Sequence, residues 1–204
     1  MSDANAYTAM TREAPWGDYG SILVHGMSAH LERLDDQLQL ERTGPYVPGI
    51  SLPGIADVIV TDEVRDRIQG ASLSGCRFAP LIKSRIVHLD WTAWDLTSEL
   101  ARELPESGEP EDFILARPHD PVLADEIGPL WELKLDAGGH IARTRSTRGR
   151  FHYAFTYTLP ASPLPDFWRG SNMRYVFISS RASDVLGGDL LRWCRMHPAV
   201  PAKA

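Results

Sequence analysis

An internal repeat limits the folds that this chain can adopt. Residues 55–80 align with residues 173–198 without gaps, at a constant offset of 118. Ten aligned pairs are identical or chemically similar: Val58/Val176, Val60/Ile178, Thr61/Ser179, Asp66/Asp184, Ile68/Leu186, Gly70/Gly188, Leu73/Leu191, Cys76/Cys194, Arg77/Arg195 and Pro80/Pro198. A solenoid needs three or more units, so two copies indicate that one structural unit was duplicated within a single fold.

Each copy has the pattern of a strand, a helix and a second strand. A short apolar run is followed by a hydroxyl residue, Thr61 or Ser179, and then by an amphipathic segment that reaches a glycine. Serine and threonine favour the N-cap of a helix, where the side-chain oxygen accepts from a free backbone N–H. A second extended segment carries Cys-Arg and ends at proline. We therefore predict a sharp turn from strand to helix in both copies.

The remaining segments mix helical and extended patterns without regular βαβ spacing, which favours an α+β fold with mixed sheets. We expect helices at 27–40, 92–104 and 120–127, and strands at 85–91, 113–115, 130–135, 141–144 and 151–159. Asp136-Ala137-Gly138-Gly139 is typical of a hairpin turn between two of these strands. A chain of 204 residues fits one domain, with lobes at 1–94 and 95–204 as the alternative.

The composition is that of a globular protein inside the cell. No apolar run approaches the ~18 residues of a membrane span, and the N-terminus lacks a signal-peptide pattern. Cys76 and Cys194 are too few for a disulfide scaffold or a structural zinc site, and we expect them to be small packing residues. We expect a cytoplasmic protein with no membrane contact, no metal and no cofactor.

The sequence contains none of the short catalytic motifs that identify an enzyme by their spacing. GxSxG, GxGxxG, the P-loop, HExxH and Cys-x-x-Cys are all absent, and the seven histidines are scattered. We therefore expect no catalytic residues. An alternative is an enzyme or small-molecule-binding protein with a pocket between the repeat units, lined by Arg77, Arg195 or His88.

The charges are segregated along the chain. The net charge of −6 divides into −4 for residues 1–94, −9 for 95–136 and +7 for 137–204. The carboxylates we expect on an exposed acidic surface are Glu99, Glu103, Glu106, Glu109, Glu111, Asp112, Asp120, Asp125 and Glu126. Such a surface steers a basic partner, unless the basic C-terminal third folds back and neutralises it. Trp168, between prolines, is a candidate exposed anchor for that partner.

One basic run is similar to a nucleic-acid-binding arm. Arg143, Arg145, Arg148 and Arg150 lie within ten residues of one another. The chain as a whole is acidic, however, and would be repelled by phosphates. We therefore expect no nucleic-acid partner.

The run RTGPYVPGISLPGIADVIVTDEVRDRI, followed by GCRFAPLIKSRIVHLDWTAWD, resembles bacterial immunity-protein families of polymorphic toxin systems. Those families carry a strand–Ser/Thr–helix–GxxFxP unit. The second copy here departs from it, with Trp193 in place of the glycine and Met196 in place of the phenylalanine. The resemblance covers residues 42–95 and part of the C-terminal third. It implies a cytoplasmic protein that neutralises a cognate toxin by occluding its active site. A secretion-system adaptor or chaperone is a further alternative, and the oligomeric state stays open.

Overall fold

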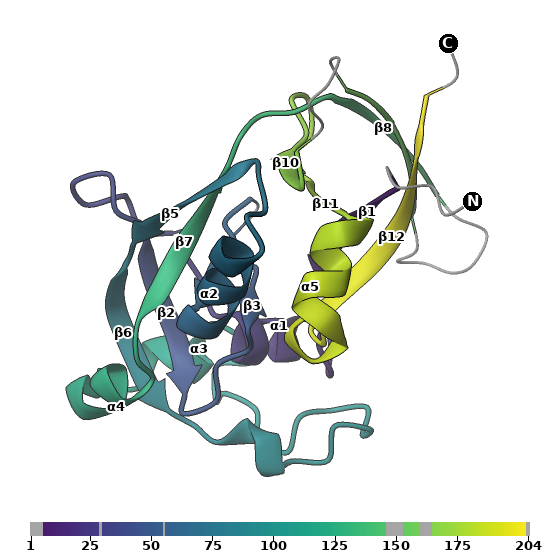
Figure 1. The fold of residues 1–204 in the computed structure, drawn as a ribbon. Helices are drawn as coiled ribbons and strands as arrows, with labels where there is room; N and C mark the ends of the chain where they lie inside the picture. The colour runs from purple at the N-terminus through teal and green to yellow at the C-terminus, as the bar shows by residue number, and fades with distance from the viewer. Residues whose placement is uncertain (1–5, 29, 55, 146–152, 160–164, 203–204) are drawn as a thin grey trace.

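The computed structural model describes residues 6–28, 30–54, 56–145, 153–159 and 165–202 (Figure 1). The strands are β1 (Tyr7–Arg12), β2 (Gln39–Gly44), β3 (Ile50–Ser51), β4 (Ile59–Thr61), β5 (Cys76–Pro80), β6 (Ile82–His88), β7 (Leu130–Leu135), β8 (His140–Arg145), β9 (Tyr153–Thr158), β10 (Phe167–Arg169), β11 (Val176–Ser179) and β12 (Cys194–Pro201). The helices are α1 (Asp18–His25), α2 (Asp62–Gly70), α3 (Asp112–Leu115), α4 (Pro121–Glu126) and α5 (Ser180–Leu190), with a 3-10 turn at Trp91–Ala93. The fold is α+β, as the sequence predicts.

The two repeat copies form equivalent strand–helix–strand units, β4-α2-β5 and β11-α5-β12. In each unit the two strands lie on either side of a third, antiparallel strand that comes from elsewhere in the chain. The sheet orders are β3-β4-β7-β5 and β10-β11-β1-β12, the second continuing into β9 and β8. Figure 1 shows α2 and α5 side by side, between the two sheets.

The central strands are exchanged between the halves of the chain. Strand β1, near the N-terminus, lies between the strands of the second unit, and β7, which follows the first unit, lies between the strands of the first. The strand registers of the two sheets correspond. Thr61 lies opposite Leu130 in the first sheet, and the matched Ser179 lies opposite Tyr7 in the second. The first half of the chain contains β1 followed by the unit β4-α2-β5, and the second half contains β7 followed by the unit β11-α5-β12. Strand β1 therefore completes the sheet of the second unit, and β7 completes the sheet of the first.

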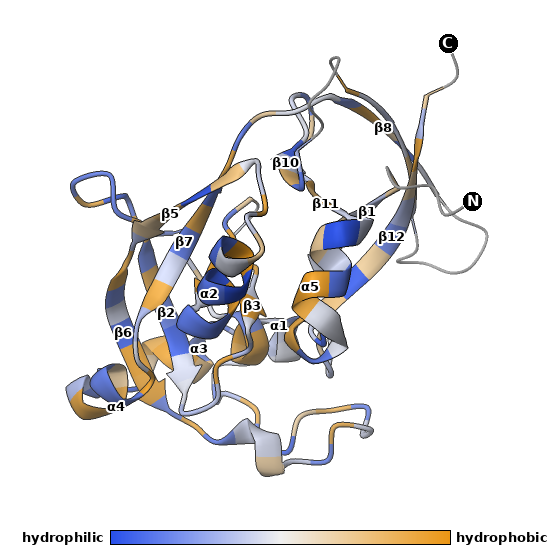
Figure 2. Cartoon of the chain, in the orientation of Figure 1, coloured by the Kyte–Doolittle hydropathy of each residue, from blue (hydrophilic) through white to orange (hydrophobic). Residues whose placement is uncertain are grey.

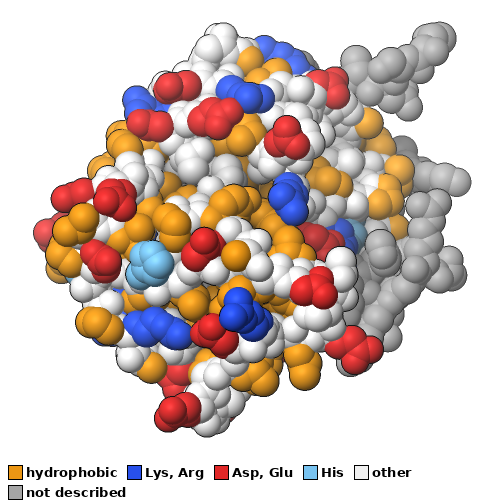
Figure 3. All heavy atoms as spheres, turned by 90° about the horizontal axis from the view of Figure 1, so that it is seen from below, with side chains coloured by type: hydrophobic (Ala, Val, Ile, Leu, Met, Phe, Trp, Pro, Cys, Tyr) orange, Lys and Arg blue, Asp and Glu red, His pale blue; other side chains and the backbone are white. Residues whose placement is uncertain are grey.

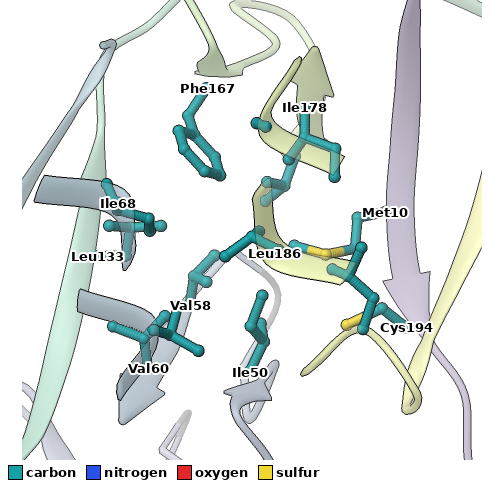
Figure 4. Close-up of a cluster of buried hydrophobic side chains, with 14 of the residues drawn as sticks. Met10, Ile50, Val58, Val60, Ile68, Leu133, Phe167, Ile178, Leu186 and Cys194 are labelled. Carbon is teal, nitrogen blue, oxygen red and sulfur yellow. The ribbon is translucent and has the colours of Figure 1, made fainter. Parts of the chain in front are cut away.

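One hydrophobic cluster joins the two halves. Its members come in equivalent pairs, among them Val58 and Val176, Val60 and Ile178, Ile68 and Leu186, Ile50 and Phe167, and Met10 and Leu133. Figure 4 shows several of these side chains converging from both units around Leu186. The duplicated unit thus buries its apolar face against its own copy, which explains why the same apolar positions recur at a fixed offset.

Two of the expected helices do not form. The described residues of this range, 27–28 and 30–40, are extended or turned, and Asp35 and Asp36 adopt positive φ angles of 50° and 63° that a helix does not permit. Residues 92–104 contain the 3-10 turn, a second turn at 96–97 and bends. Here Asp90 and Asp95 accept from the backbone N–H groups of Thr92 and Thr97, and these local turns replace helical hydrogen bonds.

The expected hairpin at residues 136–139 is also wrong. Strands β7 and β8 exist, but β7 pairs with β4 and β5, whereas β8 pairs with β9. The two glycines let the chain cross between the sheets at close range. A Cβ on Gly138 would lie 2.6 Å from the Trp168 ring, and one on Gly139 would lie 1.9 Å from the Thr158 carbonyl oxygen. These glycines therefore serve close packing rather than a two-residue turn.

The structure also tests the other helices and strands that the sequence predicts. The strand expected at 85–91 is β6, and the helix expected at 120–127 is α4, which begins after the capping residue Asp120. Residues 113–115 are helical, in α3, rather than extended. Strand β9 carries the aromatic side chains expected there, within the described residues 153–159. Within the described part of the chain, no helix has the length and apolar character needed to span a membrane.

Candidate functional site

An acidic arm, residues 95–111, leaves the body of the protein after the 3-10 turn and returns at α3 (Figure 1). It lacks regular secondary structure, yet it is fixed at several points. Trp94 and Ala101 are buried beside the aromatic cluster of Trp16 and Phe113. The arm is therefore anchored from within by apolar contacts.

Hydrogen bonds hold the outer part of the arm to α1 and to the segment that precedes α1. The Trp16 indole donates to the Ser98 hydroxyl at 3.2 Å, and the Tyr19 hydroxyl donates to the Gly108 carbonyl oxygen at 2.7 Å. At the start of the arm, Asp95 accepts from the backbone and hydroxyl of Thr97, and these bonds lower the pKa of its carboxyl group. These bonds hold the backbone of the arm against the body of the protein, and a pre-ordered backbone loses less entropy on binding.

The expected carboxylates are placed on this arm and on the two short helices that follow it. Seven of the nine are exposed: Glu99, Glu103, Glu106, Glu109, Glu111, Asp125 and Glu126. Asp112 is partly buried in the first turn of α3. Asp120 is also partly buried and accepts from the Leu123 N–H at 3.0 Å, so its observed role is to cap α4. We call residues 95–127 the acidic surface.

The acidic surface also exposes large apolar side chains, two of which, Leu100 and Leu104, belong to the helical pattern at 92–104. Leu100 is 62% exposed, Leu104 47%, Leu115 40% and Val122 66%. These are four of the seven exposed large hydrophobic residues in the described chain. Figure 3 shows this face from below, with hydrophobic and acidic side chains interspersed and a few basic ones among them. In Figure 2 hydrophobic and hydrophilic positions alternate along the arm. Exposed apolar groups rimmed by charge mark contact surfaces.

The basic C-terminal third does not neutralise the acidic surface through ion pairs in the described residues. The ion pairs that involve residues 95–136 or residues 137–204 are Arg33–Glu132, Lys134–Asp36, Arg77–Asp136, Arg181–Asp166 and Arg195–Glu13. None of the nine carboxylates takes part in one. Residues 95–127 contain ten carboxylates and two basic side chains, Arg102 and Arg117, so their net charge is −8. Their charge is therefore available to a partner.

Trp168 is not the exposed anchor that its neighbouring prolines suggested. Its side chain is fully buried and stacks on Phe177 with ring centroids 4.1 Å apart. Tyr7 and Tyr157 contact the same ring edge-on. The residue lies in β10 and belongs to a hydrophobic cluster of buried residues, so its role is in the core. Trp91 is buried too, as expected for a packing residue.

The residues nominated for a pocket between the repeat units do not meet in one place. Arg195 lines a cavity of about 540 Å³ between the units. Arg77 is exposed and pairs with Asp136 at 3.2 Å. His88 lies at a separate hollow of about 350 Å³ beside α4, together with His119. The three side chains therefore form no common site.

The matched cysteines are packing residues. Burial raises the pKa of both thiols, Cys76 and Cys194, to about 12, which keeps them protonated and unreactive. Both contact the shared hydrophobic cluster. In the described residues no group of three or more His, Cys, Asp or Glu side chains could hold a metal ion. Of the arginine-rich run, Arg148 and Arg150 lie outside the described residues.

Comparisons with known proteins add no assignment to this geometry. No protein-family model matches the sequence, and no curated protein is significantly similar to it. The functional interpretation therefore rests on the surface itself and on the sequence resemblance.

Proposed function

We propose that this chain is a cytoplasmic immunity protein that binds a cognate toxin and neutralises it by occluding its active site. The observation that carries the proposal is an anchored arm on which unpaired carboxylates surround exposed leucines. Carboxylates of this kind attract a basic protein, and the leucines supply apolar contact once it has docked. The resemblance of residues 42–95 to immunity-protein families supports the same conclusion.

The partner best suited to the acidic surface is a protein with a basic active-site region. A toxin that acts on nucleic acid or nucleotides needs cations to hold phosphate groups. The acidic surface has a net charge of −8, which is complementary to such a region. Its carboxylates would compete directly with the phosphates of the substrate. Occlusion then requires no chemistry from the immunity protein.

The direct test is to co-express the chain with the product of the neighbouring upstream gene. We expect a stable complex on size exclusion and restored growth of cells that produce the toxin. If the complex does not form and toxicity persists, the proposal fails. A complex in which the toxin remains fully active would instead identify an adaptor or chaperone, and would also contradict neutralisation.

A matched pair of variants links this outcome to the surface. Leu100→Asp with Leu104→Asp removes the apolar contact from the arm, and Leu34→Asp with Val200→Asp makes the same change at two exposed positions elsewhere. Because all four side chains are exposed, both variants should fold. We expect only the arm variant to lose protection. Equal protection by both variants would place the contact surface elsewhere.

A further inference from the structure

The cavity between the repeat units lies where equivalent segments of the two halves meet. The loop before β4 contributes Ala56 and Asp57, and the segment that leads into β11 contributes Arg174 and Tyr175. At the offset of 118 these are corresponding positions of the repeat. The volume of about 540 Å³ falls within the range of small-molecule sites. The duplication has thus created a cleft at the junction of its two copies.

Three arginines line this cleft, in a chain that is acidic overall. Arg195 is held by a bidentate pair with Glu13, and Arg12 donates to the Gly54 carbonyl oxygen at 2.9 Å. Arg174 is exposed and makes no hydrogen bond or ion pair with the described residues. The hydrogen-bond acceptors of Arg12 are the Gly54 carbonyl and the Ser21 hydroxyl, and Asp18 and Asp57 lie near enough to act on its charge without forming an ion pair with it.

One lining carboxylate accompanies these cations. Asp57 accepts from the Ser28 hydroxyl at 2.7 Å and lies 4.0 Å from the Arg33 guanidinium. Its remaining lone pairs can accept from a ligand hydroxyl or amino group. The lining of the cleft therefore combines three arginines with one carboxylate.

Aromatic and apolar side chains form the rest of the lining. Tyr153 and Tyr175 line the cleft beside the apolar residues Met10, Leu52 and Val176. Arg143 fixes the tyrosines: its guanidinium carbon lies 4.7 Å from the Tyr153 ring centroid, and it donates to the Tyr175 hydroxyl. Fixed tyrosines beside apolar groups suit a flat ring.

We propose that this cleft binds a mononucleotide, with the phosphates on Arg12 and Arg174 and the base against Tyr153, Tyr175 and the apolar lining. Arginine recognises phosphate through charge-assisted, bidentate hydrogen bonds, and two guanidinium groups without an ion-pair partner among the described residues match a multiply charged phosphate better than a single carboxylate. The site uses none of the residues of the acidic surface. Nucleotide binding in this cleft goes beyond the proposed immunity function, and a failure of one proposal leaves the other unaffected.

The test is calorimetric titration of the purified full chain with ADP, GDP, CDP and UDP, and with adenosine and inorganic phosphate as partial probes. We expect at least one nucleotide to bind, and both partial probes to bind far more weakly, because each occupies only part of the lining. Arg174→Ala should weaken nucleotide binding by about 10-fold or more, the usual loss when a charge-assisted bond is removed. Arg102→Ala, an exposed arginine on the arm, is the matched control and should bind as the unmodified chain does.

A melting experiment separates binding from folding. Because Arg174 has no partner among the described residues, Arg174→Ala should melt at the temperature of the unmodified chain without ligand, while the rise produced by nucleotide should shrink. The proposal is overturned if none of the four nucleotides binds at about 1 mM, or if Arg174→Ala and Arg102→Ala bind equally. Binding of single-stranded RNA without any mononucleotide binding would overturn it as well.

Discussion

At the residue scale, buried polar side chains connect segments that are distant in sequence. Arg42, fully buried in β2, donates to the carbonyl oxygens of Thr43, Val24 and Tyr46 and to the Ser51 hydroxyl. Burial lowers the pKa of this guanidinium to about 10. Its bonds join α1, β2 and the loop that leads to β3. The sequence gives no sign of this role, because an arginine beside a glutamate and a threonine is equally typical of a solvated strand face.

His25 gives the fold a measurable pH dependence. It is fully buried, its Nδ1 accepts from the Leu52 N–H at 3.3 Å, and burial, with Arg12 nearby, lowers its pKa to about 3. In the unfolded chain the pKa is about 6.5, so below that pH the unfolded state binds a proton that the folded state excludes. Stability is therefore lost as the pH falls from 6.5 toward 3. From pH 7 to pH 5 this one group should cost about 2 kcal/mol.

The variant His25→Gln keeps a hydrogen-bond acceptor but cannot take up the proton. We expect its free energy of unfolding, measured by urea titration at pH 7, 6 and 5, to fall less steeply than that of the unmodified chain. Because only the slopes are compared, a uniform loss of stability in the variant does not affect the result. Parallel slopes would show that His25 is not excluded from protonation.

At the element scale, the two units share a pattern but not every contact. Ser179 accepts from the Ala182 N–H at 3.0 Å and donates to Asp166 at 2.9 Å, so it caps α5 as the sequence predicts. Thr61 occupies the same position before α2 but makes no side-chain cap. In α5 the helix breaks at Gly187, whose φ of 74° and ψ of 167° are not helical, one residue before the matched Gly188, and a further helical stretch reaches Leu190.

This asymmetry can be measured with two equivalent substitutions. Ser179→Ala should destabilise the protein by about 1–2 kcal/mol, because it removes a cap and the hydroxyl that donates to Oδ1 of Asp166. Thr61→Ala should cost less than about 0.5 kcal/mol, since it removes no cap hydrogen bond. Denaturant midpoints of the two variants decide the question. Equal losses would mean that the hydroxyls at the two positions have the same role.

The elements predicted correctly are those with a strong local signal. Helix α4 begins at Asp120 followed by proline, and both repeat units have an apolar run, a hydroxyl and a glycine. The incorrect helix at 92–104 followed apolar spacing alone. The pairs Asp90–Thr92 and Asp95–Thr97 were the missed signal, because an aspartate two residues before a threonine favours a local turn. These turns interrupt the helical pattern, and Leu100 and Leu104 lie exposed on the arm instead of on a helix.

At the scale of the whole molecule, the exchange of β1 and β7 makes each half depend on the other. The repeat in sequence predicts two similar units, but not which strand completes each sheet, because β1 and β7 have no recognisable sequence match. That information lies in long-range pairing, such as Tyr7 opposite both Ser179 and Ala199. The acidic surface was predicted from its charges. The shape of the acidic surface depends on the local turns at Asp90 and Asp95, and the charge pattern does not predict those turns.

Cutting the chain in the arm tests this dependence. Fragment 1–107 lacks β7 and fragment 108–204 lacks β1, so neither should fold alone. An equimolar mixture should recover the circular dichroism and cooperative melting of the intact chain. As a control, fragment 13–107 lacks β1 and should not restore the structure. A cooperatively folded fragment 1–107 on its own would contradict the exchange.

The account also makes a kinetic prediction for the acidic surface. Charges on the arm accelerate encounter with a basic partner, and salt screens this attraction. Reversing Glu103, Glu106 and Glu109 to lysine should therefore slow association and weaken its dependence on ionic strength. Reversing the exposed Asp66, Asp184 and Asp189 to lysine makes the same change in net charge away from the arm.

The association rate constant of each variant with the co-expressed toxin, measured across ionic strength, tests the central claim most directly. We predict that the arm variant associates at least about 10-fold more slowly at low salt, and that the control stays near the unmodified chain. Rate constants that are equal for the two variants at every ionic strength would contradict the claim that the acidic surface receives the partner.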